Sequence, residues 1–145
     1  MSGSGGVLGL GLDLVEVEGF HEQLKRAGTS FGEGTFTPGE IAAAMEAGNP
    51  ASAAFARHLA ARFAAKEAFV KAWSMGRAGR EPAMPSVRWR EIEVVSDSWG
   101  RPRLVVAGET ERRLRDTLGE VEVSISLTHE DSVAGAVVVL SGVQR

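Results

Sequence analysis

Apolar residues alternate with glycines and acids near the amino terminus, in the stretch "VLGLGLDLVEV" over residues 7–17. Alternation over a run of this length is typical of a β-strand. Glycines inside a strand leave room for another backbone to approach closely. The pattern therefore predicts a first strand over 7–17, and Asp13 falls inside it. The preceding residues 1–6, "MSGSGG", are expected to form a flexible leader.

The middle of the chain changes to a helical pattern. "FHEQLKRAG" predicts a short helix closed by Gly28, and a Gly/Ser/Thr loop follows it. "FTPGEIAAAMEAG" begins with Thr37 as N-cap, Pro38 at the first helical position and Glu40 completing a capping box, and it ends at Gly48. "ARFAAKEAFVKAW", residues 61–73, is rich in alanine and contains no glycine or proline, which predicts a long helix.

The second half predicts a loop, a hairpin, a helix and two more strands. The expected elements are a loop over 74–86, a strand over 87–97, a turn over 98–102, a strand over 103–108, an amphipathic helix over 109–119, and two strands within 120–140 about a turn near 129–131. No internal repeat or boundary interrupts this order. The chain is expected to be one α+β domain over 7–145.

Composition narrows the class of partner. The chain has 145 residues, 43% of them apolar, and a formal net charge of -3 with a pI near 5.6. Such a charge does not favour nucleic acid as a partner, and no run approaches the roughly 18 apolar residues of a membrane span. The absence of cysteine excludes disulfides and thiolate chemistry. It is compatible with a cytoplasmic protein.

Charged residues on the long helix form two stripes when placed at the helical periodicity. Phe63, Glu67 and Lys71 follow one another at i, i+4 spacing, and Arg62 and Lys66 form a second stripe. Six alanines cover the far side: Ala60, Ala61, Ala64, Ala65, Ala68 and Ala72. Exposed salt bridges of about 0.2–0.5 kcal/mol each would explain the pairs. Three cations around one carboxylate beside large apolar side chains suit a polyanion held through a metal ion better.

Two further residues have both a structural and a functional interpretation. Asp13 is costly to bury in an apolar strand unless a cation or hydrogen bonds satisfy it, and with Glu67 it would supply the oxygen ligands that Mg²⁺ prefers. A strand-end acid facing water is an equally plausible interpretation of Asp13. His129 follows "SLT", where Ser126, Thr128 and the imidazole could contact a phosphate. A lone histidine in a turn is more often simply solvated.

Five segments together resemble a known family. They are "GLGLDLVEVEGF", "FTPGE", "ARHLAARFAAKEAFVKAW", "IEVVSDSWGRPRL" and "VSISLTHED", in the order and spacing of the holo-acyl-carrier-protein synthases. These are the small bacterial type of 4'-phosphopantetheinyl transferase, and the resemblance covers nearly the whole chain. Most diagnostic are D-x-x-E over 13–16 and F-A-A-K-E-A over 63–68.

The resemblance implies a fold, a reaction and a site. The fold would be an antiparallel sheet packed around a long central helix, with one such module per chain. Members transfer the 4'-phosphopantetheine arm of coenzyme A to a serine of apo-acyl carrier protein, in fatty acid biosynthesis, and release 3',5'-ADP. The resemblance implies that Asp13 and Glu67 bind Mg²⁺, with Mn²⁺ as a substitute, and that the coenzyme A phosphates are surrounded by Arg62, Lys66, Lys71, Ser126, Thr128 and His129. Asp13 and Lys71 are expected to be catalytic as well. The reaction also needs an acceptor for the serine proton, and we expect Glu67 to take it, directly or through a metal-bound water.

The resemblance also implies an assembly. Family members are homotrimers with sites between subunits, and His129 would reach the phosphates from a neighbouring subunit. The acidic carrier would dock on Lys25 and Arg26 of the first helix. The loop over 74–86 would either lie over the nucleotide or be mobile without ligand, and mobility is the expectation.

Two rival functions follow from the same features. A hot-dog acyl-CoA thioesterase would hydrolyse the thioester without a metal, and a non-catalytic CoA-binding module would hold phosphates without chemistry. Incubation with coenzyme A, Mg²⁺ and apo-carrier protein separates these rivals from a transferase.

Overall fold

The computed structural model describes residues 4–26 and 29–143. Residues 1–3 of the expected leader and the helix-closing Gly28 lie outside this part. The elements, in chain order, are β1 (Ser4–Glu16), α1 (Val17–Arg26), α2 (Thr29–Thr35), α3 (Pro38–Ala47), α4 (Ala53–Met75), η1 (Trp89–Glu91), β2 (Ile92–Ser96), β3 (Pro102–Val106), α5 (Gly108–Leu118), β4 (Val121–His129) and β5 (Val133–Val143).

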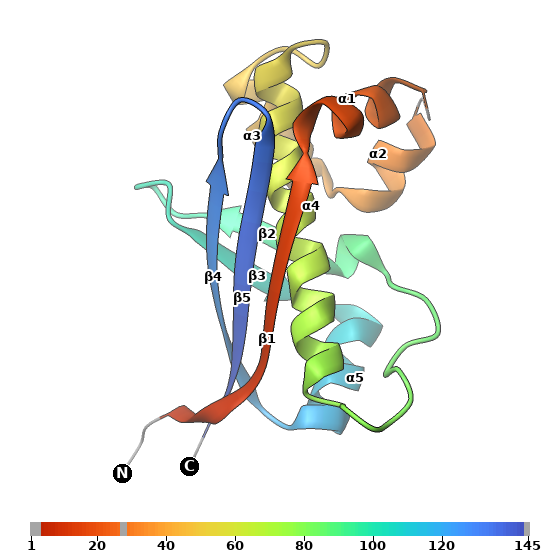
Figure 1. Ribbon diagram of the computed structural model, residues 1–145, viewed down its shortest axis with the longest axis vertical. Helices are drawn as coiled ribbons and strands as arrows, with labels where there is room; N and C mark the ends of the chain where they lie inside the picture. Colours follow the sequence, from red (N-terminus) through yellow and green to blue (C-terminus); the bar gives the residue numbers. More distant parts are fainter. Residues whose placement is uncertain (1–3, 27–28, 144–145) are drawn as a thin grey trace.

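The larger sheet is antiparallel and has the strand order β1-β5-β4 (Figure 1). Its register aligns Asp13 with Ala136 and Ala136 with Leu127. Because side chains alternate along a strand, one face of the sheet presents Ala136, Val138 and Leu140 to the interior, where all three are buried. The opposite face of β1 carries exposed leucines.

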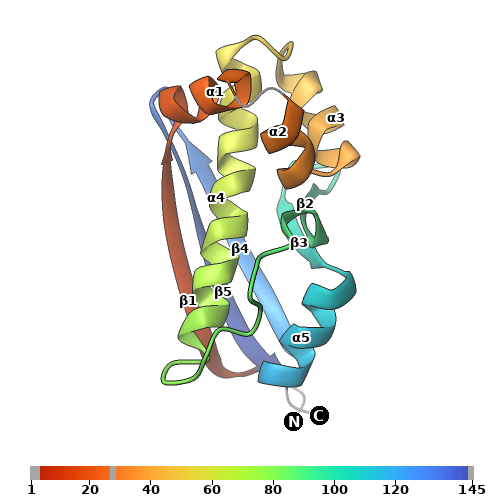
Figure 2. The same cartoon turned by 90° about the vertical axis from the view of Figure 1, so that its right-hand side faces the viewer.

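Helix α4 lies along the inner face of this sheet, between it and the second layer (Figure 2). A Cβ atom built on Gly9 would overlap the carbonyl oxygen of Ala72, and one on Gly11 would overlap that of Ala68. The six alanines named above are buried against these strands. Glycines on β1 and alanines on α4 thus let the two backbones approach closely, as the sequence predicted.

The second layer consists of the antiparallel β2–β3 hairpin and α5. Phe69 and Trp73 of α4 pack with Ile92 and Leu114 in a core shared by both layers. At the other end of α4, helices α1, α2 and α3 enclose a second core around Phe20. The α+β class and the antiparallel sheet around a long helix are therefore confirmed.

Several boundaries differ from the sequence-based predictions. Strand β1 begins at Ser4, three residues before the predicted start, because residues 4–6 continue its pairing toward the end of β5. The glycine-bearing loop after α1 contains helix α2. Its Phe31 makes edge contacts with the rings of Phe20 and Phe63, and this packing offsets the low helix propensity of its sequence "TSFGEGT".

The strand predicted over 87–97 is shorter, because a 3-10 turn occupies its first part. The capping box of α3 is present as predicted: Thr37 accepts from Glu40 N at 3.2 Å, and the Glu40 side chain accepts from Thr37 N at 3.0 Å. Ser52 caps α4 in the same way, accepting from Phe55 N at 3.1 Å.

Candidate functional site

Asp13, Glu67 and Lys71 come together between β1 and α4. Asp13 has the same strand parity as Gly9 and Gly11, so its side chain points toward α4. Lys71 Nζ lies 3.0 Å from Asp13 Oδ1 and donates to the Leu12 carbonyl at 3.1 Å. Glu67 precedes Lys71 by one helical turn. Two acids far apart in the chain thus share one short stretch of surface.

The electrostatics of this cluster favour a bound cation. Burial raises the pKa of the Glu67 carboxyl, the Asp13 carboxylate raises it further, and the Lys71 ammonium lowers it in part. A second carboxylate nearby penalises ionisation because like charges repel. One lysine therefore does not offset both acids, and a divalent ion with oxygen ligands fits the pair. Residues 4–26 and 29–143 contain no group of three or more potential metal ligands, so substrate oxygens or water would complete the coordination.

Arg62, His58 and His129 form a second, cationic cluster. Arg62 Nη1 contacts the His58 carbonyl at 3.5 Å. Burial, then the charges of Arg62 and His129, lower the pKa of His58 to about 4. His129 at the end of β4 therefore lies near the first turns of α4. An anion that contacted this cluster would meet one permanent positive charge and two imidazoles.

His58 should make stability depend on pH. Its pKa in the folded state, about 4, lies below the ordinary value of 6.5, so the unfolded chain binds more protons between these values. The contribution of His58 to folding stability is then fully present above pH 6.5 and is lost progressively as the pH falls toward 4. We expect the melting temperature to fall over this range, and less so in His58→Gln. An equal fall in both proteins would contradict this source of the pH dependence.

The position of Lys66 contradicts the prediction that its side chain contacts the coenzyme A phosphates. Its side chain is fully buried, and Nζ donates to Glu40 Oε1 at 2.7 Å, to the Thr35 carbonyl at 2.7 Å and to the Trp89 carbonyl at 3.0 Å. The physical reason is that α2, α3 and η1 cover this side of α4. Helical periodicity placed Lys66 on a stripe with Arg62, but it could not show that other elements cover the stripe.

The remaining predicted residues lie on other surfaces. Ser126 and Thr128 are exposed on the face of β4 that points away from α4. Lys25 and Arg26 are exposed in the last turn of α1, where Lys25 Nζ lies 3.7 Å from Glu22 Oε1. Neither pair joins the Asp13–Glu67–Lys71 cluster within one chain.

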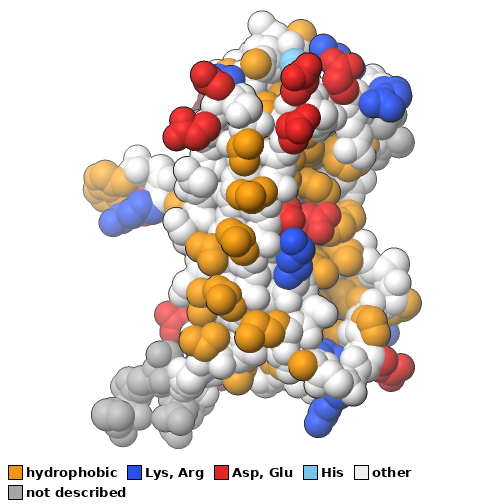
Figure 3. All heavy atoms as spheres, viewed as in Figure 1, with side chains coloured by type: hydrophobic (Ala, Val, Ile, Leu, Met, Phe, Trp, Pro, Cys, Tyr) orange, Lys and Arg blue, Asp and Glu red, His pale blue; other side chains and the backbone are white. Residues whose placement is uncertain are grey.

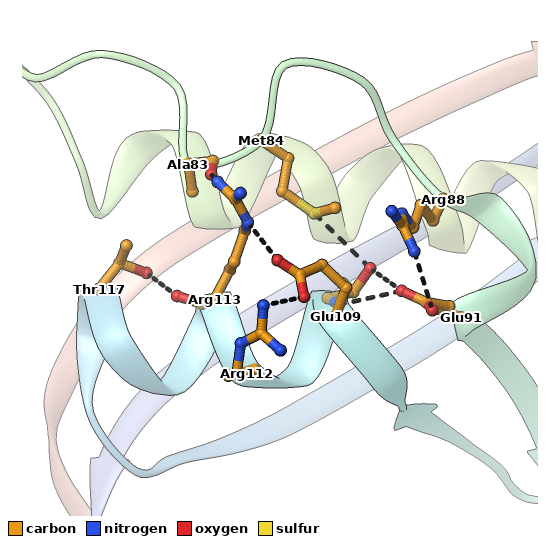
Figure 4. A network of polar contacts seen from close by, with 9 residues as sticks. Ala83, Met84, Arg88, Glu91, Glu109, Arg112, Arg113 and Thr117 are labelled. Carbon is orange, nitrogen blue, oxygen red and sulfur yellow. Dashed lines mark hydrogen bonds and ion pairs between the residues drawn. The ribbon is translucent and has the colours of Figure 1, made fainter.

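The loop between α4 and η1 is held in its middle by α5 (Figure 4). Arg113 Nη1 donates to the Ala83 carbonyl at 2.9 Å, and Arg113 Nε donates to Glu109 Oε1 at 2.8 Å. Thr110 donates through N and Oγ1 to Glu91 Oε1, at 3.0 and 2.8 Å. Arg112 also pairs with Glu109. The Arg113–Ala83 contact attaches the loop to α5, and the Thr110–Glu91 contacts attach η1 to it.

Beneath this loop lies a cavity of about 280 Å³. Its walls include Val70, Trp73 and Ser74 of α4 and Arg77 and Arg80 of the loop. Val70 and Ser74 lie within two turns of Glu67 on the same helix.

Sequence reasoning missed two participants. His58 precedes Arg62 by four residues, and helical periodicity placed it beside the stripe of Arg62 and Lys66 without giving it a role. Glu40 was interpreted only as part of a capping box, although its carboxylate also accepts from Lys66 and from Val94 N at 2.9 Å. No local pattern signals the latter contacts, which join residues 26 and 54 positions apart.

Comparisons with known proteins show the family to which this chain is related. Residues 9–135 match the profile of the 4'-phosphopantetheinyl transferase superfamily. The holo-[acyl-carrier-protein] synthase of Mycolicibacterium smegmatis is 49% identical over 134 residues, covering 92% of this chain and 96% of that protein. The Mycobacterium marinum enzyme of the same name is 48% identical over 135 residues, covering 93% and 97%.

Solved structures show the same fold. The Chronobacterium ammoniagenes ACPS–CoA complex superimposes with a TM-score of 0.84 at 40% identity, covering 94% of this chain and 98% of that one. The acyl carrier protein synthase of Mycobacterium tuberculosis gives a TM-score of 0.72 at 42% identity, covering 94% and 99%. With the profile matched over most of its length and relatives near half identity, this chain belongs to the 4'-phosphopantetheinyl transferase superfamily.

Proposed function

We infer that this protein is a holo-[acyl-carrier-protein] synthase, which transfers 4'-phosphopantetheine from coenzyme A to a serine hydroxyl of apo-acyl carrier protein and releases 3',5'-ADP. The observation that carries this conclusion is the meeting of Asp13, Glu67 and Lys71 in a chain of this family. Coenzyme A is the substrate, as the CoA-bound structures of relatives support.

The reaction breaks a phosphoanhydride bond, so the protein must align the serine oxygen and offset charge on the phosphoryl oxygens. Asp13 and Glu67 would hold Mg²⁺ or Mn²⁺, which supplies positive charge to the diphosphate. Lys71, more than half exposed beside Asp13, can donate to a phosphate oxygen. Glu67 is the proposed acceptor of the serine proton through a metal-bound water, because a carboxylate that holds Mg²⁺ is itself a weaker base.

The cationic cluster is proposed to bind other phosphate oxygens of coenzyme A. Arg62 and His129 offer donors to an anion. His58 beside them is neutral at neutral pH, so it adds no positive charge that would repel Arg62. The cavity beneath the loop, with apolar walls and Arg77 and Arg80 at its border, is proposed to receive the nucleotide end. Ser126 and Thr128 would contribute from the outer face of β4, which points away from α4.

This division of residues between two faces supports a homotrimer with sites between subunits. The outer face of β1 exposes Leu10, Leu12 and Leu14 at 50, 62 and 66%. Figure 3 shows hydrophobic side chains gathered in a band over this sheet. An apolar band of this kind marks a contact with another protein surface. Packing of the band against another copy would bring one subunit's Ser126 and Thr128 toward another's acidic cluster.

Substitution of the band should separate the subunits. We expect Leu12→Asp to give monomers in sedimentation velocity and to lose most transferase activity, because a buried carboxylate at the interface would lack a partner. Glu46→Gln, an exposed acid on α3 and away from this sheet, serves as the control. A fully active monomer of either protein would refute the interfacial site.

Carrier docking is proposed at the end of α1. Lys25 and Arg26 are exposed there, and an acidic partner would be attracted to them. We expect Arg26→Glu to raise the KM for the carrier about tenfold at low salt and to leave the KM for coenzyme A unchanged. A change in the KM for coenzyme A alone would move the docking surface elsewhere.

One assay tests the function itself. Incubation with coenzyme A, Mg²⁺ and apo-carrier protein should add the phosphopantetheine mass to the carrier, as read by mass spectrometry. Free thiol released from an acyl-CoA would instead indicate a thioesterase, and binding without turnover would indicate a non-catalytic module.

No helix within residues 4–26 and 29–143 is long and apolar enough to cross a bilayer. A role in fatty acid biosynthesis in the cytoplasm is the corresponding cellular proposal.

A further inference from the structure

Arg62 is a partly buried cation without a carboxylate partner. Within the described residues its guanidinium makes one hydrogen bond, from Nη1 to the His58 carbonyl at 3.5 Å. Within residues 4–26 and 29–143 it forms no ion pair. A desolvated arginine in this state is suited to bind an incoming anion, because no internal acid competes for its donors.

A potential competitor nevertheless lies close by. The negative charge of Glu40 reaches Arg62 and partly offsets the effect of burial on the pKa of Arg62. Glu40 is only 2% exposed. Its Oε1 accepts from Thr37 N at 3.0 Å and from Lys66 Nζ at 2.7 Å, and its Oε2 accepts from Val94 N at 2.9 Å.

Lys66 is the cation that balances Glu40. It is fully buried, and besides Glu40 it binds the Thr35 and Trp89 carbonyls, which carry no formal charge. Its only carboxylate partner within the described residues is therefore Glu40. Since Lys66 lies one helical turn after Arg62, the two cations reach toward the same acid from one side of α4.

We propose that Lys66 is a positioning residue that neutralises Glu40 and thereby leaves the Arg62 guanidinium free to bind a phosphate of coenzyme A. This inference rests on the proposed function, in which Arg62 contacts coenzyme A. It gives the buried Lys66–Glu40 charge pair a part in substrate binding, although neither Lys66 nor Glu40 touches the substrate.

The two halves of the pair should have unequal effects. Without the lysine, the buried Glu40 carboxylate has no cation in contact with it, and the cation on which its charge already acts, Arg62, is drawn toward it and away from the substrate. Without the carboxylate, Lys66 loses its partner but Arg62 meets no competing anion. Both changes destabilise the fold, and only the first should weaken coenzyme A binding.

The test compares Lys66→Met, Glu40→Gln and the double variant Glu40→Gln/Lys66→Met in the full-length protein. Lys66→Met is expected to raise the KM for coenzyme A about tenfold, which corresponds to the loss of one hydrogen bond to a charged group. Glu40→Gln is expected to change this KM little. The double variant should return toward the original KM. Thermal melting is recorded for each. Glu93→Gln is the matched control, since Glu93 accepts from Thr37 Oγ1 at 2.6 Å in the same network.

A purely structural role predicts a different pattern, in which the KM for coenzyme A follows the melting temperature in all variants. That pattern would overturn the proposal, as would an unchanged KM in Lys66→Met.

Arg62→Gln separates the proposal from the proposed function. If this variant turns over coenzyme A with an unchanged KM, the function stands and the positioning role fails. Should Lys66→Met not fold, the proposal requires Glu40→Gln and the double variant to share the original KM, and a raised KM in either refutes it.

Discussion

Glu67→Gln is expected to lower phosphopantetheine transfer by about 10²- to 10⁴-fold while the protein stays folded. The change removes one of the two carboxylates proposed to hold the metal ion and also removes the proposed proton acceptor. Burial and the neighbouring Asp13 already disfavour ionisation of Glu67 in the folded state. The neutral amide should therefore leave the melting temperature at neutral pH unchanged or slightly higher.

The measurement is the rate of carrier modification by mass spectrometry at saturating Mg²⁺, with Mn²⁺ binding followed by electron paramagnetic resonance. Asp13→Asn should behave similarly, since Asp13 is the other proposed ligand. Glu46→Gln, an exposed acid on α3, controls for loss of surface charge. Turnover near the original value in Glu67→Gln, with unchanged Mn²⁺ binding, would remove this residue from the site.

The second large effect is expected at Gly11, where β1 meets α4. A Cβ atom at this position would overlap the Ala68 carbonyl oxygen and lie 2.8 Å from Ala72 N. Helix backbone cannot shift locally without losing its own hydrogen bonds, so the strand and helix must separate. We expect Gly11→Ala to lower the free energy of unfolding by about 3 kcal/mol or more.

Urea unfolding followed by circular dichroism checks this value. Gly6→Ala is the matched control on the same strand, because a Cβ atom there has no neighbour within 4 Å. The separation of β1 from α4 would also move Asp13 away from Glu67, so activity should fall in the Gly11 variant even at temperatures where it remains folded. Similar stability of the two variants would show that the close approach is not required.

Local patterns predicted those elements whose causes are local. The capping box that begins α3 depends on residues within four positions of one another. The glycines of β1 predicted a close backbone contact, although they did not identify its partner. Helix α2 was missed for the opposite reason. Its stability comes from contacts of Phe31 with rings on α1 and α4, which no local window contains.

The sequence by itself determined the α+β order, the family through its motifs, and the identity of the two acids of the candidate site. The tertiary structure alone decided which charges meet. The 3.0 Å contact of Lys71 with Asp13 depends on the packing of α4 against β1, whereas Lys66 turns inward to Glu40. Periodicity specifies the direction in which a helical side chain points, but what covers that direction depends on elements that are distant in the chain. For that reason one segment of α4, residues 66–71, includes both a buried structural cation and an exposed cation at the site.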